Sequence, residues 1–299
     1  MKYKKQHYVP ASYLKAWCDP NTPLKHEPYV WMCSTDGRQI NKKPPRKIFH
    51  EKDFYTIRQV DGRRNLTLEH GLSQLESQFA ALRRNKLDKN LPLTDEERIV
   101  LCAFVAAMFA RTKSRREFLR EQWQPLLDLG EKMIEWARNA SPDELKQMSA
   151  ALRAPIEDKA PLMSMADVER IVEQPIQSFL VPEIGTTTPF LFRMRSVIVE
   201  TFTQPGFITS DAPCVYFDPE LGKHPAPFGA GGLISPTIEI SLPLSPRQFI
   251  LFGHRLIHDG YYAPLKPYDP LVDQINRRTR IFADEHIIIN QNVIKQSWF

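Results

Sequence analysis

Apolar residues recur at helical spacing over the middle third of the chain. In the stretch 67–86 they fall every three or four positions, which predicts an amphipathic helix with one buried face. A capping box opens at Thr94, and the run 99–110 behind it is apolar on every side. A helix without a polar face has to be surrounded by other elements, so we expect this second helix to be central in the core.

The helical pattern continues beyond this run with a strongly basic composition. It runs on past Arg111, and Pro125 is expected to end or kink it. Ser141 and Ser164 each open a further cap signal, the second for a helix that reaches toward Pro175. The middle of the chain is therefore predicted to be helical.

Both ends of the chain change to the β-branched and aromatic composition of strands. The expected strands are 29–34, 53–60, 196–203, 207–209, 237–242, 248–252 and 286–290, with one late helix over 270–285. Helices and strands both need a face to bury, which favours an α+β fold with a helical core packed on an antiparallel or mixed sheet from the C-terminal third and the N-terminal region. We expect a single domain over 1–299, divided into a β-leaning region 1–60, a helical region 65–180 and a β-rich region 190–299 with the late helix.

Composition narrows the class of protein. Apolar residues make up 42% and charged residues 25%, which excludes a disordered chain. The longest apolar run has twelve residues, too short to cross a bilayer, and no apolar stretch follows the N-terminal charges as in a signal peptide. The four cysteines lie far apart without a CxxC pair, so neither a disulfide framework nor a zinc site is expected. These features predict a cytoplasmic protein without a membrane partner.

Charge is distributed unevenly along the chain. Residues 1–120 hold 24 Lys and Arg against 13 Asp and Glu, a net charge of +11, while the rest hold 16 against 22, a net charge of −6. A basic half indicates an anionic partner, and we expect nucleic acid or a nucleotide to bind through these 120 residues. The alternative is an ordinary solvated surface, because a charge count does not say which face the charges share.

Familiar nucleotide-binding and hydrolase signatures are missing. There is no GxxxxGK[ST], GxSxG or HExxH, and no GxGxxG between a strand and a helix. The glycine-rich stretch 228–232 is interpreted as a loop. His254 and His258 follow a strand-like run and precede Asp259-Gly260, so a turn is favoured over a pair of metal ligands.

Two glutamates of the first long helix and one arginine are candidates for chemistry. At about 100° per residue, the spacing of seven places Glu69 and Glu76 on one side of the helix, at the border of its apolar stripe. Such carboxylates can hold a divalent cation, pair with an arginine, or form a solvated flank. Arg111 directly follows the apolar run, so its guanidinium must find oxygen partners, either in a salt bridge to one of these glutamates or on a bound phosphate.

Two further polar clusters lie beside proline. His7 precedes Pro10 at an expected helix start and could act as a general acid or base, although a lone histidine is more often structural. Ser210 and Asp211 follow a short apolar strand, where site residues are often presented, but Ser and Asp also close turns through their own hydrogen bonds.

Several of these segments together resemble the family known as domain of unknown function 4238, found mainly in bacteria. The matching pieces are QHYVPxxYLKxW at 6–17, DFYT at 53–56, LExxLxxLExxFA at 68–80, Ala110-Arg111-Thr112, FITSDAP at 207–213, PLSP at 243–246 and Asn276. The resemblance spans nearly the whole chain and implies one family-wide domain. The polar set that it implies is His7, Glu69, Glu76, Arg111, Ser210, Asp211 and Asn276.

Three positions depart from the family pattern. Trp17 replaces a phenylalanine, Ala212 replaces a frequent asparagine, and Met108 replaces a glutamine. The last two changes make the expected site less polar. The resemblance implies a site and names no reaction.

The leading hypothesis is a phosphodiesterase or nuclease that depends on Mg²⁺ or Mn²⁺. In it Glu69, Glu76 and Asp211 bind the metal, His7 transfers a proton and Arg111 holds the phosphate, with Asp211 also among the catalytic residues. Ser210 and Asn276 are further candidates. One alternative is a non-catalytic nucleic-acid or nucleotide binding module of a defence or stress system. The other is a buried polar network that stabilises the fold.

Overall fold

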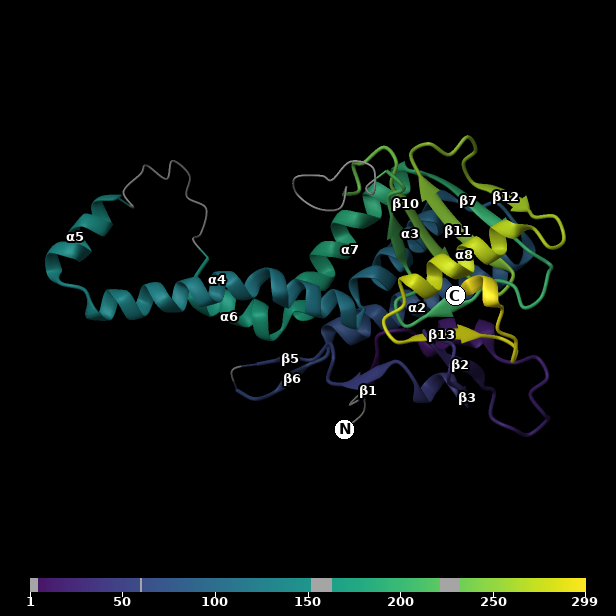
Figure 1. Cartoon of the computed structure of the whole chain (residues 1–299), viewed down its shortest axis with the longest axis horizontal. Helices are drawn as coiled ribbons and strands as arrows, with labels where there is room; N and C mark the ends of the chain where they lie inside the picture. Colours follow the sequence, from purple (N-terminus) through teal and green to yellow (C-terminus); the bar gives the residue numbers. More distant parts are fainter. Residues whose placement is uncertain (1–4, 60, 152–162, 221–231) are drawn as a thin grey trace.

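The protein has an α+β fold with a projecting helical arm (Figure 1). The computed structural model describes residues 5–59, 61–151, 163–220 and 232–299. Its helices are α1 (Ala11–Leu14), α2 (Thr67–Asn85), α3 (Asp95–Ala110), α4 (Lys113–Asn139), α5 (Pro142–Ala151), α6 (Met165–Glu173), α7 (Pro175–Arg193) and α8 (Pro270–Ile281). In Figure 1, α4, α5 and α6 extend to the left of the body that the other elements form.

A five-stranded sheet forms one layer of the body. Its order is β12 (Tyr261–Pro264), β7 (Arg195–Glu200), β11 (Gln248–Gly253), β10 (Glu239–Pro243) and β9 (Val215–Phe217). All neighbours are antiparallel except β12 and β7, which are parallel. Alternating side chains such as Ile240, Leu242 and Ile250 are buried, so one face of the sheet joins the main core.

A second sheet joins the two ends of the chain. Its order is β3 (Ile40–Lys43), β2 (Val30–Ser34), β13 (His286–Ile289) and β8 (Thr209–Ser210). The N-terminal region adds two small ribbons, β1 (Lys5–His7) with β4 (His50–Lys52) and β5 (Ile57–Arg58) with β6 (Arg64–Asn65). Because β2 pairs with the last strand, the N-terminal region closes only when the C-terminal third is in place.

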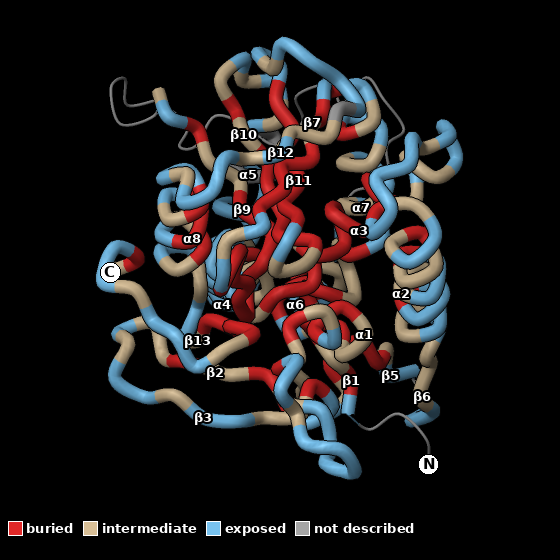
Figure 2. Tube along the Cα trace, turned by 90° about the vertical axis from the view of Figure 1, so that its right-hand side faces the viewer, coloured by how far each residue is buried: buried red, intermediate tan, exposed pale blue. Residues whose placement is uncertain are grey.

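Helix α3 lies in the interior, as its sequence predicts. The Thr94 side chain accepts a hydrogen bond from the Glu97 N–H, and the Glu97 side chain accepts one from the Thr94 N–H, which completes the expected capping box. Its Phe104 ring stacks on Phe79 of α2 with 3.7 Å between ring centroids. Buried residues gather around α3, β7 and β11 (Figure 2). Each large apolar side chain buried there contributes about 1.5–3 kcal/mol to stability.

The segment after α3 differs from the prediction of one continued helix. Helix α3 ends at Ala110, and the Thr112 hydroxyl accepts a hydrogen bond from the Arg115 N–H, which starts α4 as a new helix. Pro125 does not end α4 but lies inside it. Proline leaves the Glu121 carbonyl without its helical donor, and exposure of Glu121 on the arm lets water take that place.

The strand predicted over 53–60 is wrong. Strand β4 stops at Lys52, and Asp53 has a left-handed φ of 57° in a turn in which the Thr56 N–H donates to the Asp53 carbonyl over 3.1 Å. Only Ile57 and Arg58 then form a strand, and residue 60 lies outside the described residues.

The other predicted elements occur within a few residues of their expected bounds. Helix α7 extends the helical region past residue 180 to Arg193, through two internal prolines. The short strands β1, β3, β9 and β12 were not expected, because three or four residues carry too little pattern to be recognised. Of the glycine-rich stretch, residues 228–231 lie outside the described residues. No described helix has the length and apolarity that crossing a bilayer requires.

Gly206 offers a test of how tightly the β10–β11 turn is packed. Its φ is +79°, and a Cβ there would lie 2.0 Å from the Pro246 carbonyl oxygen, which already accepts a hydrogen bond from the Phe207 N–H. We predict that Gly206→Ala lowers the free energy of unfolding by about 3 kcal/mol, because strain and overlap add. Urea unfolding measures this loss.

The matched control is Gly71→Ala on exposed α2, where a Cβ meets nothing within 4 Å. Alanine there is expected to add about 0.5–1 kcal/mol. Equal effects of the two substitutions would contradict the packing described for Gly206.

Candidate functional site

Arg111 is a buried charge at the junction of α3 and α4. Its side chain is 2% exposed and donates three hydrogen bonds, to Glu76 Oε1 over 2.8 Å, to the His7 carbonyl over 2.6 Å and to the Tyr55 hydroxyl over 3.1 Å. Burial disfavours its charged form, but Tyr55 and Glu76 outweigh burial and raise the pKa of Arg111. Of the alternatives for Arg111, the structure contains the salt bridge to Glu76.

Glu69 lies on the same helix α2 as Glu76, near the same guanidinium. It is half-buried and forms no hydrogen bond with the part of the chain that the structure describes. Burial raises the pKa of Glu69, with Glu76 acting in the same direction and Arg111 against it. Glu76, but not Glu69, lines a cavity of about 370 Å³ between α1 and α2, together with three serines.

His7 is held beside this cluster by the β1–β4 ribbon. Its ring meets the His50 ring edge-on at 5.2 Å, and its Nε2 is buried without a hydrogen-bond partner. Burial, together with the neighbouring His50, lowers the pKa of His7 to about 4. The imidazole is therefore neutral at pH 7, and its backbone carbonyl, not its ring, contacts Arg111.

Asp211 lies at the end of β8 and serves the backbone. Its carboxylate accepts hydrogen bonds from the N–H groups of Asp284, Glu285 and His286, each over 2.8 Å, and it is 3% exposed. These bonds hold the turn that leads into β13.

The expected metal site of Glu69, Glu76 and Asp211 does not assemble. Asp211 is committed to three backbone donors and Glu76 to Arg111. Across the described ranges, no three His, Cys, Asp or Glu side chains are placed to hold a metal ion.

Ser210 and Asn276 also bond to the backbone. The Ser210 hydroxyl accepts from the Ala212 N–H over 3.2 Å. Asn276 is fully buried on α8, where its amide accepts from the Ile208 N–H over 3.0 Å and donates to the Gly206 carbonyl over 2.8 Å. Both side chains therefore stabilise the segment that leads through β8.

The basic start of α4 is largely neutralised. Lys113 and Arg116 pair with Glu51 over 3.1 and 2.6 Å, and Arg115 pairs with Glu183. Arg120 pairs with a glutamate one turn earlier on its own helix. These ion pairs leave little free positive charge on this face, although the sequence shows it as a cationic run.

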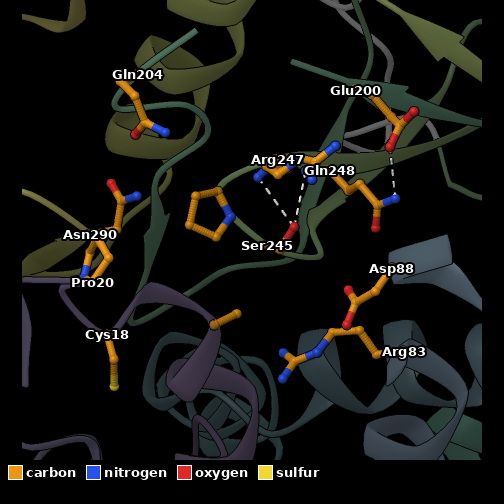
Figure 3. A pocket seen from close by; sticks show the side chains of 12 residues that line it. Cys18, Pro20, Arg83, Asp88, Glu200, Gln204, Ser245, Arg247, Gln248 and Asn290 are labelled. Carbon is orange, nitrogen blue, oxygen red and sulfur yellow. Dashed lines mark hydrogen bonds between the residues drawn. The ribbon is translucent and has the colours of Figure 1, made fainter. Parts of the chain in front are cut away.

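A polar cavity of about 430 Å³ lies elsewhere, between α2 and the ends of both sheets (Figure 3). Segments far apart in the sequence form its wall, from the N-terminal region, the end of α2, the end of β7, the β10–β11 turn and the residue after β13. The lining residues are Ala16, Cys18, Pro20, Arg83, Asp88, Glu200, Gln204, Ser245, Pro246, Arg247, Gln248 and Asn290.

Two arginines of this wall have no carboxylate partner. Arg83 is half-buried and, among the described residues, its side chain donates to the Tyr13 carbonyl over 3.4 Å, while Arg247 lies over the exposed Phe202 ring at 4.5 Å. Neither forms an ion pair with any described residue. Burial lowers the pKa of Arg83, and nearby Asp88 acts in the opposite direction. Unlike the arginines of α4, these two guanidinium groups are available to an anion.

Some residues of the cavity wall also carry buried polar atoms without partners. Glu200 accepts from Gln248 over 3.0 Å and from Asn90 over 2.6 Å, so its carboxylate is satisfied. In contrast, Gln248 Oε1 and Asn290 Oδ1 are buried and unbonded. Such an acceptor costs about 1–3 kcal/mol, and structures retain few of them.

The sequence offered little signal for this cavity. Ser245 and Pro246 belong to the PLSP piece at 243–246, but no periodicity or spacing connects them with Arg83 or Asn290. Residues drawn from five separate segments are brought together only by the tertiary fold.

The comparison with protein families finds a match over nearly the whole chain. A family model described as protein of unknown function, DUF4238, matches residues 5–292. The chain belongs to this family. The expected resemblance is thereby confirmed, and the match covers the elements of both sheets. No curated protein and no solved structure matches the chain significantly.

A double-mutant cycle tests the buried pair of this DUF4238 protein. Removing one partner leaves the other charge buried, so Arg111→Met and Glu76→Gln are each expected to cost about 3 kcal/mol of unfolding free energy. The double variant should cost less than the sum, with a coupling of about 1–3 kcal/mol in urea unfolding.

The exposed pair Arg63 and Asp61 serves as the control. Its cycle, with Arg63→Met and Asp61→Asn, should give a coupling below about 1 kcal/mol. If both cycles gave the same small coupling, the buried network would not be a determinant of stability.

His7 predicts a pH dependence of stability. Its pKa is about 4 when folded and near 6.5 when unfolded, so between these values only the unfolded chain takes up the proton. The contribution of His7 to the free energy of unfolding should therefore be constant above pH 6.5 and fall as the pH drops toward 4, by up to about 1.4 kcal/mol per pH unit.

Urea unfolding of the wild type and His7→Gln between pH 5 and 8 isolates this contribution, because the other titrating groups cancel in the difference. A difference that does not change with pH would contradict the buried, neutral imidazole.

Proposed function

We propose that the cavity binds a nucleotide and that the protein is a nucleotide-binding module. The observation that carries this proposal is the pair of guanidinium groups, Arg83 and Arg247, that line one cavity without a carboxylate partner among the described residues. Guanidinium groups donate paired hydrogen bonds to phosphate oxygens, and a partly buried one gains most from such a partner.

The rest of the cavity suits the remainder of a nucleotide. Its volume of about 430 Å³ lies within the usual range for small-molecule sites. Ala16, Pro20 and Pro246 add apolar surface beside the polar groups, against which a base or ribose could pack.

The metal-dependent cleavage of phosphodiesters stays a prediction. In its favour, Glu69 and Glu76 lie close enough to Arg111 for all three charges to influence one another. Against it, Glu76 and Asp211 already have partners that a metal would have to displace. Binding of nucleic acid through the basic first 120 residues likewise remains a prediction, and the ion pairs of α4 reduce its support.

Isothermal titration calorimetry with AMP and ATP tests the proposal. We expect micromolar dissociation constants in the wild type and a loss of about 10- to 100-fold in Arg247→Gln, because one charge-assisted interaction is removed. Arg138→Gln, on exposed α4 far along the arm, is the matched control and should bind like the wild type.

Two outcomes would contradict the proposal: no heat with either nucleotide at about 1 mM, or unchanged affinity in Arg247→Gln. Repeating the titration with Mg²⁺ or Mn²⁺ and analysing the products distinguishes binding from catalysis. Product formation that is lost in Glu76→Gln would favour the hydrolase instead.

A further inference from the structure

We propose that the nucleotide of this cavity carries an amino group on its base, and that Gln248 and Asp88 bind this group. The inference rests on the proposed function and extends it to the chemical class of the base.

The orientation of the Gln248 amide is fixed by its neighbours. Its Nε2 donates to the Leu87 carbonyl over 2.8 Å, to Asn90 Oδ1 over 3.0 Å and to Glu200 Oε1 over 3.0 Å. All three partner atoms are acceptors, so a flipped amide would place oxygen against oxygen. Gln248 Oε1 is therefore always an acceptor, and it has no hydrogen-bond partner although the side chain is only 3% exposed.

Asp88 supplies a second acceptor in the cavity wall. It follows Leu87, whose carbonyl holds Gln248, and both residues line the cavity. In Figure 3, Gln248 Oε1 is turned away from Glu200 toward the wall where Asp88 and Arg83 lie. The Asp88 carboxylate makes no hydrogen bond or ion pair within the described ranges, so it too is available to a donor.

The cavity wall thus carries groups of opposite character. Arg83 and Arg247 can only donate, whereas Gln248 Oε1 and Asp88 can only accept, and Asp88 lies beside Arg83. A complementary ligand carries an anionic group for the arginines and an N–H donor for the two acceptors. Among nucleotides, adenine, cytosine and guanine each offer an exocyclic amino group, while uracil places a carbonyl oxygen where cytosine has its amino group.

This difference makes CMP and UMP a matched pair of probes. They share the phosphate and the ribose, and a carbonyl facing Gln248 Oε1 would leave buried acceptors opposed and unpaired. Calorimetry should give at least about tenfold tighter binding of CMP than of UMP to the wild type. AMP should likewise bind more tightly than purine riboside 5′-monophosphate, which lacks the amino group.

Two variants test the assigned side chains. Asp88→Asn keeps the shape of an exposed residue while adding a donor, and it should reduce the CMP preference at least about threefold. Gln248→Met removes the fixed acceptor, and its folding is checked by thermal unfolding because it also loses the Nε2 bonds. Asp143→Asn, on the arm in α5, is the control and should keep the wild-type preference.

The outcomes separate the two proposals. Equal affinities for CMP and UMP in the wild type, or a preference that persists in Asp88→Asn, would overturn the assignment of Gln248 and Asp88 as acceptors. Nucleotide binding itself would stand. If inorganic phosphate, ribose 5-phosphate, AMP, ATP, CMP and UMP all fail to bind, both proposals are overturned.

Discussion

The charge of Arg111 is the interaction on which the body of this protein depends. A guanidinium that is removed from water has to be surrounded by acceptors, and here they come from Glu76 of α2, the His7 carbonyl of β1 and Tyr55. Helix α3 ends directly before this residue, which caps it. The guanidinium therefore lies at the end of the helix, where partners from three other segments can reach it. One buried charge thereby determines how α2, α3 and the N-terminal ribbon fit together.

The C-terminal third uses buried polar side chains in the same way. Asp211 holds the turn before β13 through three backbone N–H groups, and Asn276 holds the segment before β8 in place of a neighbouring strand. Irregular segments that run through a core need such partners, because water cannot reach their backbone groups. Polar residues that a motif singles out can therefore be essential for the fold without contacting a ligand.

The cavity differs from these networks because some of the polar groups in its wall stay unsatisfied. Two arginines lack carboxylates, and a fixed glutamine oxygen lacks a donor. Keeping such groups unpaired costs stability, and a ligand of matching charge and hydrogen-bonding pattern would recover that cost. This contrast, more than the identity of any residue, distinguishes the cavity from the buried clusters.

Local pattern was enough to predict much of the fold. The amphipathic stripe of α2, the capping box and all-round apolarity of α3, and the composition of β7, β11 and β13 are short-range properties, as was the burial of Arg111 behind an apolar run. The break before α4 and the turn at Asp53 are also made by local hydrogen bonds, but three residues carry too little pattern for the sequence to show them. Tertiary contacts decided the commitment of Asp211 to backbone donors and the meeting of Arg83 with Arg247. Periodicity reports which face of an element is buried, whereas the partner of a polar group is chosen by segments that lie far away along the chain.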